Sequence, residues 1–137
     1  MSYIVTGGAG FVGSNMVRKL NDEGIKDVII IDNYDEAKMP NLVGLDFTNY
    51  IDYTDGLDVV GRTLEGLSNV EGIFHIGANA DVLDADAKRM MVMNYEFSRL
   101  YCDFAAKRDI PFVYASSSAV YGNSPSQLGG GRFPIAT

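Results

Sequence analysis

The sequence predicts an α/β domain, a parallel sheet of strand order 3-2-1-4-5 with helices on both faces, truncated after strand 5. Two observations lead to this fold class. Short β-rich runs alternate with longer runs of helical periodicity. One segment, DVIIID (27–32), holds a continuous run of β-branched residues, as in a strand covered on both faces. Alternating strands and helices form right-handed βαβ units, and the strand order follows by analogy with nucleotide-binding folds.

The expected elements fill most of the chain, and we expect residues 1–137 to form one domain. Glycines end the first strand, and apolar residues then recur at helical spacing up to Gly24. The expected strands are residues 3–6, 27–32, 41–47, 71–77 and 110–117. The expected helices run from 11 to 24, from about 57 to Gly66, and from about 84 to 108.

Composition excludes several classes of function. The net charge of −7 argues against a nucleic-acid groove and against docking to an anionic membrane. The single Cys102 cannot form an internal disulfide, which favours a cytoplasmic location. His75 has no Cys or His at ligand spacing, so we predict a hydrogen-bonded core histidine and no metal site.

The segment TGGAGFVGS (6–14) places three glycines between a strand and a helix. Gly7 permits a tight turn, Gly10 lets the backbone approach a pyrophosphate, and Gly13 allows close packing of helix on sheet. The first helical N–H groups, at Phe11 and Val12, lack helical partners and suit a phosphate. The alternative is a tight turn that binds no ligand.

An acidic residue ends the second strand, 19 residues past Gly13. In a Rossmann-type domain, Asp32 and the adjacent Asn33 would meet the adenosine ribose, although Asp32 could also serve only to form a turn. Lys38 could meet the 2′-phosphate of NADP or be a solvated loop lysine, whereas Asp32 favours NAD by repelling that phosphate. The pattern therefore predicts a bound dinucleotide, NADP or NAD.

These motifs, with the segment SSSAVYG (116–122), resemble the extended short-chain dehydrogenase/reductase family of nucleotide-sugar epimerases and dehydratases over residues 2 to about 124. Within it, NLVGLDFTNYID, MMVMNY and IPFVYASS look most like the ADP-glycero-manno-heptose 6-epimerases. The resemblance implies a nucleotide-sugar substrate, which is oxidised transiently on a nicotinamide cofactor and then takes the hydride back on its other face.

The resemblance also implies a catalytic role for Ser117, which would hydrogen-bond the sugar hydroxyl undergoing oxidation. The family's base is a tyrosine in a Tyr-x-x-x-Lys pair, where the lysine lowers a phenol pKa that is otherwise about 10. No such pair follows Ser117 in this sequence. We therefore expect a cofactor-binding part that is inactive alone; a non-catalytic binding module is the alternative. Ser118 and Ala119, in place of the dehydratases' acid pair, disfavour dehydration.

Four further positions carry expectations from the resemblance. Gly77 and Ala78 would let the cofactor pass close to the backbone, or simply form a turn of small residues. Asn94 would help to order the active site, or face solvent. The heptose epimerases have a lysine where this chain has Tyr53, which weakens the case for NADP. The fifth strand is expected at an edge of the sheet. Its unpaired backbone groups and apolar face would favour a homo-oligomer.

Overall fold

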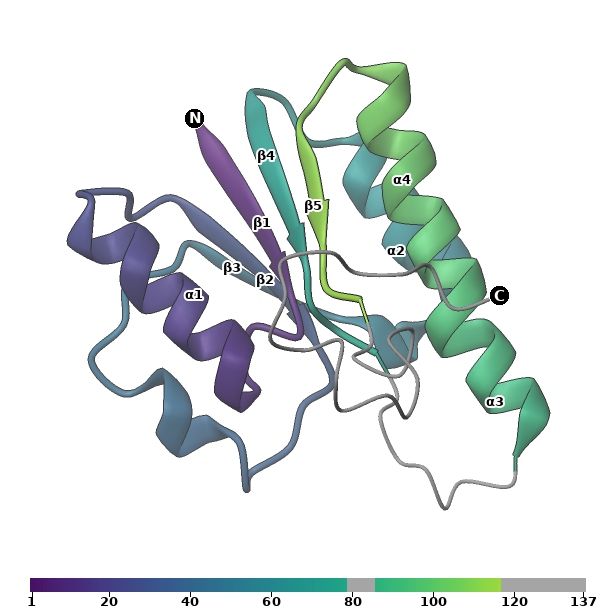
Figure 1. Cartoon of the computed structure of the whole chain (residues 1–137), viewed down its shortest axis with the longest axis horizontal. Helices are drawn as coiled ribbons and strands as arrows, with labels where there is room; N and C mark the ends of the chain where they lie inside the picture. The colour runs from purple at the N-terminus through teal and green to yellow at the C-terminus, as the bar shows by residue number, and fades with distance from the viewer. Residues whose placement is uncertain (79–85, 117–137) are drawn as a thin grey trace, which may run out of the picture.

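The computed structural model describes residues 1–78 and 86–116, and shows a five-stranded sheet. The strands are parallel, in the order β3-β2-β1-β4-β5, as the sequence predicted. Helix α1 lies on one face of the sheet, and α2 and α4 lie on the other (Figure 1). The strands are β1 Ser2–Thr6, β2 Val28–Asp32, β3 Asn49–Asp52, β4 Val70–His75 and β5 Phe112–Tyr114.

The helices follow the periodicity of the sequence. The expected long helix is continuous in direction but contains a π-helical segment, Val92–Glu96, between α3 and α4. No helix in the described part of the chain is long and apolar enough to cross a membrane. The helices are α1 Phe11–Asp22, α2 Leu57–Glu65, α3 Ala87–Met91 and α4 Phe97–Lys107.

The core consists of two apolar clusters, one on each face of the sheet. Successive side chains of a strand point to opposite faces, so Val5 and Ile30 pack beneath α1, while Ile4 and Ile31 pack beneath α2 and α4. This explains why residues 28–32 are all buried and why their sequence shows no polar alternation.

The prediction of the third strand at 41–47 was wrong. Met39–Leu42 forms a 3₁₀ turn, and Gly44 has a φ of +76°, which a strand does not contain. Leu42 and Leu45 are apolar because they pack against the cluster beneath α1, not because they belong to a strand. The actual strand is only four residues long, too short for its alternation to be recognised.

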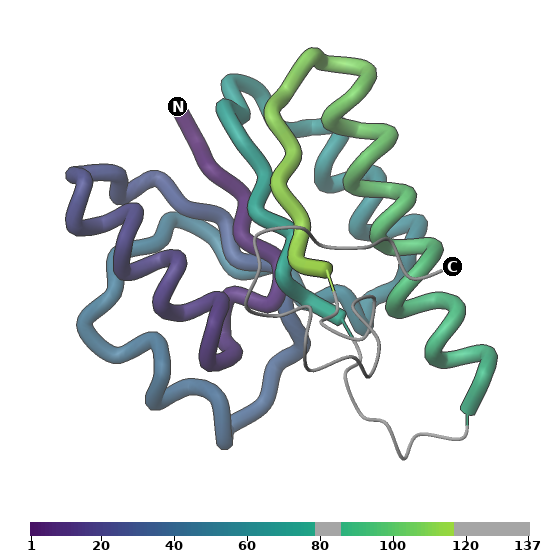
Figure 2. Tube along the Cα trace, in the orientation of Figure 1, coloured from purple at the N-terminus to yellow at the C-terminus, as the bar shows by residue number. Residues whose placement is uncertain are grey.

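Strand β5 forms one edge of the described sheet, next to β4 (Figure 2). It is shorter than the predicted 110–117, and the side chains of Val113 and Tyr114 are exposed. An exposed apolar edge strand is compatible with the expected homo-oligomer, which stays a prediction.

Candidate functional site

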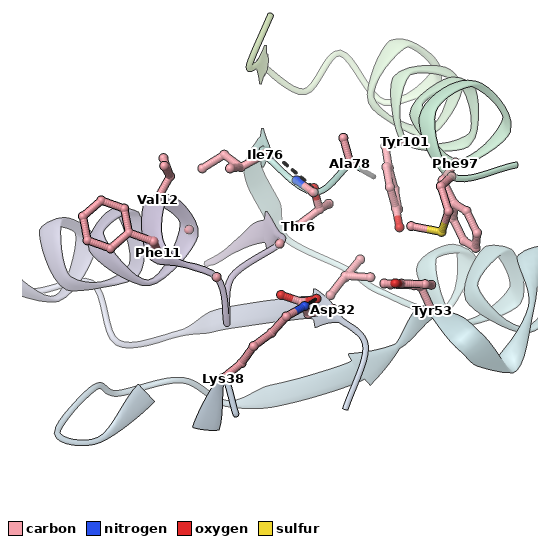
Figure 3. Close-up of a pocket in the computed structure, with 16 residues that line it drawn as sticks. Thr6, Phe11, Val12, Asp32, Lys38, Tyr53, Ile76, Ala78, Phe97 and Tyr101 are labelled. Carbon is pink, nitrogen blue, oxygen red and sulfur yellow. Dashed lines mark hydrogen bonds and ion pairs between the residues drawn. The ribbon is translucent and has the colours of Figure 1, made fainter. Parts of the chain in front are cut away.

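A pocket of about 280 Å³ opens at the carboxyl ends of β1, β2 and β4. In open parallel sheets this edge, near the point where strand order reverses, is where ligands bind. Figure 3 shows the pocket bordered by the start of α1, the end of β2 and the aromatic residues of α4. The structure brings together these predicted cofactor-binding residues along its walls: Gly7, Gly10, Phe11, Val12, Gly13, Asp32, Lys38, Gly77 and Ala78.

The glycine turn is formed by close contact between two backbone segments. Gly7 has a φ of +68°, and a Cβ on Gly7 would lie only 2.7 Å from the Cα of Gly77. A Cβ on Gly77 would in turn lie 2.8 Å from the nitrogen of Gly7. The Gly7 N–H donates to the carbonyl of Ile31 at 2.7 Å, which joins the turn to β2. Side chains are therefore excluded from the floor of the pocket.

The start of α1 leaves its first amide groups available to a ligand. Gly10 is the N-cap residue, no side chain caps the helix, and no acidic residue lies in the first turn. The helical bonds begin with Ser14 N–H donating to the Gly10 carbonyl at 2.9 Å. The side chains of Phe11 and Val12 are exposed beside the pocket. Uncapped N–H groups and the positive end of the helix dipole suit an anion.

Asp32 connects the end of β2 to the glycine turn. Its side chain is only 5% exposed. One carboxylate oxygen accepts from the N–H of Ala9 at 3.0 Å; the other accepts from the N–H of Asn33 at 2.8 Å and from Lys38 Nζ at 3.0 Å. Lys38 Nζ also donates to the side-chain oxygen of Asn33 at 2.6 Å. Lys38 is thus an ion-pair partner of Asp32, an arrangement that sequence reasoning did not predict.

The end of the pocket beyond Asp32 is aromatic. Tyr101 is buried, Phe97 stacks beside it, and Tyr53 meets Phe97 edge-on with ring centroids 5.7 Å apart. Burial raises the pKa of both Tyr53 and Tyr101, so both phenols are neutral near pH 7. Sequence reasoning missed Phe97 and Tyr101, because apolar residues at helical spacing indicate a core-facing helix whether or not that face also lines a pocket.

The remaining predicted site residues do not line the pocket. Asn33 lies next to the pocket, and its side-chain oxygen accepts a hydrogen bond from Lys38 Nζ. Asn94 lies in the π-helical segment, with its side-chain amide 3.9 Å from the sulfur of Met90. Ser117, and with it the prediction for the substrate hydroxyl, lies outside the described residues.

His75 is a core histidine, as the sequence predicted. Its ring is 7% exposed. Nδ1 lies 2.6 Å from Thr6 Oγ1, and Nε2 lies 2.6 Å from Ser98 Oγ. Both ring nitrogens are therefore hydrogen-bonded within the protein.

The fold of this chain is similar to solved structures of UDP-sugar 4-epimerases. Over most of this chain the fold is similar to UDP-N-acetylglucosamine 4-epimerase from Methanobrevibacter ruminantium M1 (29% identity, 98% of this chain, 43% of that chain, TM-score 0.74). It is also similar to UDP-glucuronic acid 4-epimerase from Bacillus cereus, solved with UDP-glucuronic acid and NAD (22% identity, 98% and 46%, TM-score 0.74).

A third solved relative is the enzyme WbmG from Bordetella bronchiseptica, in complex with NAD and UDP (22% identity, 97% of this chain, 41% of that chain, TM-score 0.68). The chain spans less than half the length of these three structures. The family model described as the NAD dependent epimerase/dehydratase family matches residues 3–133. The chain therefore belongs to the NAD-dependent epimerase/dehydratase family.

Proposed function

We propose that this chain is the dinucleotide-binding part of a nucleotide-sugar epimerase and that it holds NAD(H) in the described pocket. The observation that carries the proposal is an uncapped helix N-terminus that shares one pocket with the buried carboxylate of Asp32. The pyrophosphate would lie against the N–H groups of α1, and the adenosine ribose would lie beside Asp32. The close Gly7–Gly77 contact keeps side chains out of the path between them.

The bound nicotinamide would supply the hydride acceptor and donor for the epimerisation. The residues of this chain would bind and orient the cofactor. The uncapped backbone N–H groups at the start of α1 would donate to phosphate oxygens. The neutral phenols of Tyr53 and Tyr101 offer hydroxyls without adding negative charge beside Asp32. Ser117 would orient the sugar hydroxyl, while the proton would pass to a base outside the described residues. A chain lacking that base would bind the cofactor without turnover.

We expect Lys38 to set the balance between NAD and NADP. Lys38 neutralises Asp32, which would otherwise repel a 2′-phosphate. Lys38→Met should therefore weaken NADP binding relative to NAD by about fivefold, the upper end of the scale of a partly exposed ion pair. Calorimetric titration with both dinucleotides measures this ratio. Lys26→Met is the matched control, because Lys26 pairs with Asp46 outside the pocket. An equal change in the ratio of NADP to NAD affinity in the Lys38→Met and Lys26→Met variants would contradict this role of Lys38.

The sugar is proposed from resemblance. The segments that resemble the heptose 6-epimerases support ADP-glycero-manno-heptose as the substrate. The solved 4-epimerases support a second candidate, a UDP-sugar epimerised at carbon 4. Incubating the full-length gene product with each substrate, and identifying the inverted carbon by NMR, separates the two. Cofactor binding without turnover of any nucleotide sugar would favour a non-catalytic module.

Ser117→Ala, made in the full-length gene product, should lower kcat by about 100-fold, the usual cost of losing one hydrogen bond to a reacting oxygen. Ser116→Ala is the matched control, and we expect it to change kcat by less than about threefold, because the resemblance assigns the contact with the substrate hydroxyl to Ser117 alone. Steady-state kinetics measures both. Equal effects of the two substitutions would remove Ser117 from its role.

A further inference from the structure

A chain of hydrogen bonds, buried between Thr6 and His75, runs beside the pocket and joins β1, β4, α4 and the π-helical segment. Thr6 at the end of β1 contacts His75 Nδ1 at 2.6 Å, and His75 Nε2 contacts Ser98 in α4 at 2.6 Å. Ser98 Oγ donates to the carbonyl of Asn94 at 2.9 Å, in the π-helical segment. At the other end, Thr6 Oγ1 accepts from the N–H groups of Ile76 and Gly77 at 3.1 and 3.0 Å.

The N–H donors at one end and the carbonyl acceptor at the other fix every proton between them. The N–H groups of Ile76 and Gly77 can only donate, so they occupy the lone pairs of Thr6 Oγ1 and leave its O–H to donate to His75 Nδ1. The carbonyl of Asn94 can only accept, so Ser98 uses its O–H there and must accept from His75 Nε2. The network is therefore complete only when the ring is neutral and carries its proton on Nε2.

The surroundings of the ring oppose its protonation. The ring of His75 lies tilted against Tyr101 of α4 and stacks on Phe112 of β5, with ring centroids 5.1 and 5.9 Å away. The polar groups that face it are the hydroxyls of Thr6 and Ser98, and the phenol of Tyr101 is neutral. Among the described residues no carboxylate hydrogen-bonds the ring, and burial lowers its pKa.

A proton on Nδ1 would face the O–H proton of Thr6. Thr6 would have to turn its O–H away and accept from the ring, which removes a lone pair from the N–H groups of Ile76 and Gly77. Those two N–H groups also donate to the carbonyl oxygen of Thr6, at 3.3 and 3.0 Å. The attachment of Gly77 to Thr6 would therefore weaken but would not be lost. Gly77 is the residue that packs against Gly7 at the floor of the pocket.

We propose that His75 is a positioning residue whose neutral, Nε2-protonated form holds Gly77 against Gly7, and that protonation of His75 loosens the dinucleotide pocket. The hydrogen-bond chain stands on its own geometry, whereas its effect on a ligand rests on the proposed function. His75 would not touch the cofactor; it would act through Thr6 and Gly77.

The first test is NMR of the ligand-free chain, in which His75 is the only histidine and its ring nitrogens are unambiguous. At pH 8 we expect an unprotonated Nδ1 and a protonated Nε2. The ring should gain a proton only below about pH 6.5, the ordinary histidine pKa, and the Gly77 amide signal should shift with the same titration. A proton on Nδ1 at pH 8, or a Gly77 amide signal that does not shift as His75 titrates, would overturn the proposal.

The second test is the pH dependence of NAD affinity, measured by calorimetry. In the unaltered chain the Kd should be constant between pH 7 and 8.5 and rise at least about tenfold as the ring becomes protonated. His75→Gln offers an amide acceptor and donor that do not titrate, so its Kd should stay flat with pH. The same rise in the glutamine variant would overturn the role of His75. A folded chain that binds no NAD at any pH would contradict the proposed function, while the NMR result would still decide the hydrogen-bond chain.

Discussion

We expect that replacing Gly13 by alanine abolishes folding or severely lowers the free energy of unfolding. A Cβ at this position would collide with the carbonyl oxygen of Gly7 and lie 2.6 Å from its carbonyl carbon and 2.8 Å from the Cα of Gly8. All these atoms are backbone, so the clash can be relieved only by moving α1 away from β1. Overpacking a core costs about 1–3 kcal/mol when side chains can adjust, and a rigid backbone should push the cost above that. Thermal and urea unfolding followed by circular dichroism measure the loss.

Gly61→Ala is the matched control for that substitution. Gly61 lies within α2, and its added Cβ would lie 3.5 Å from Leu100 Cδ1, an ordinary contact. Alanine is a better helix former than glycine by about 1 kcal/mol, so this variant should be as stable as the unaltered chain or slightly more so. A Gly13→Ala variant with an unchanged midpoint of unfolding would contradict the close packing of α1 on the glycine turn.

Gly10→Val should leave the fold intact and remove dinucleotide binding. Gly10 has φ −75° and ψ 177°, which any residue adopts, and the nearest atom to its added Cβ would be the Gly7 carbonyl oxygen at 3.3 Å. The valine would stand in the pocket where we place the pyrophosphate. We expect Kd for NAD to rise at least about 100-fold, because both the space and the approach to the helix amides are lost.

Circular dichroism measures whether the Gly10→Val variant is folded, and calorimetry measures its affinity for NAD. Gly66→Val is its control, since Gly66 ends α2 outside the pocket and an added Cβ would meet nothing closer than Thr63 O at 3.5 Å. Unchanged NAD affinity in a folded Gly10→Val chain would remove the pyrophosphate from the start of α1.

The sheet order was predictable because most strands and helices have a strong local signal and the strand order of nucleotide-binding folds supplied the rest. Residues 28–31 are continuously apolar because both faces of β2 are covered, and Gly24, with its positive φ, follows the end of α1. The third strand was not predictable, since at β3 only one of four residues is buried, while nearby Leu42 is buried and Leu45 partly buried outside any strand. Burial alone does not reveal which backbone conformation achieves it.

The candidate site was predictable where backbone geometry dictates the residue type. Gly7 and Gly13 must be glycine because other backbone atoms occupy the space of a side chain. The ion pair of Lys38 with Asp32 and the pocket-facing position of Tyr101 depend on how separate segments meet in three dimensions. No local pattern in the sequence encodes those contacts.

The most direct measurement is a titration of residues 1–137 with NAD, followed through backbone amide NMR signals. A dinucleotide site predicts saturable binding at one site, with the largest shifts at Gly7, Gly10, Asp32 and Gly77, which line the same pocket. Saturable shifts confined to residues outside that pocket, or no binding by a folded chain, would contradict the dinucleotide site.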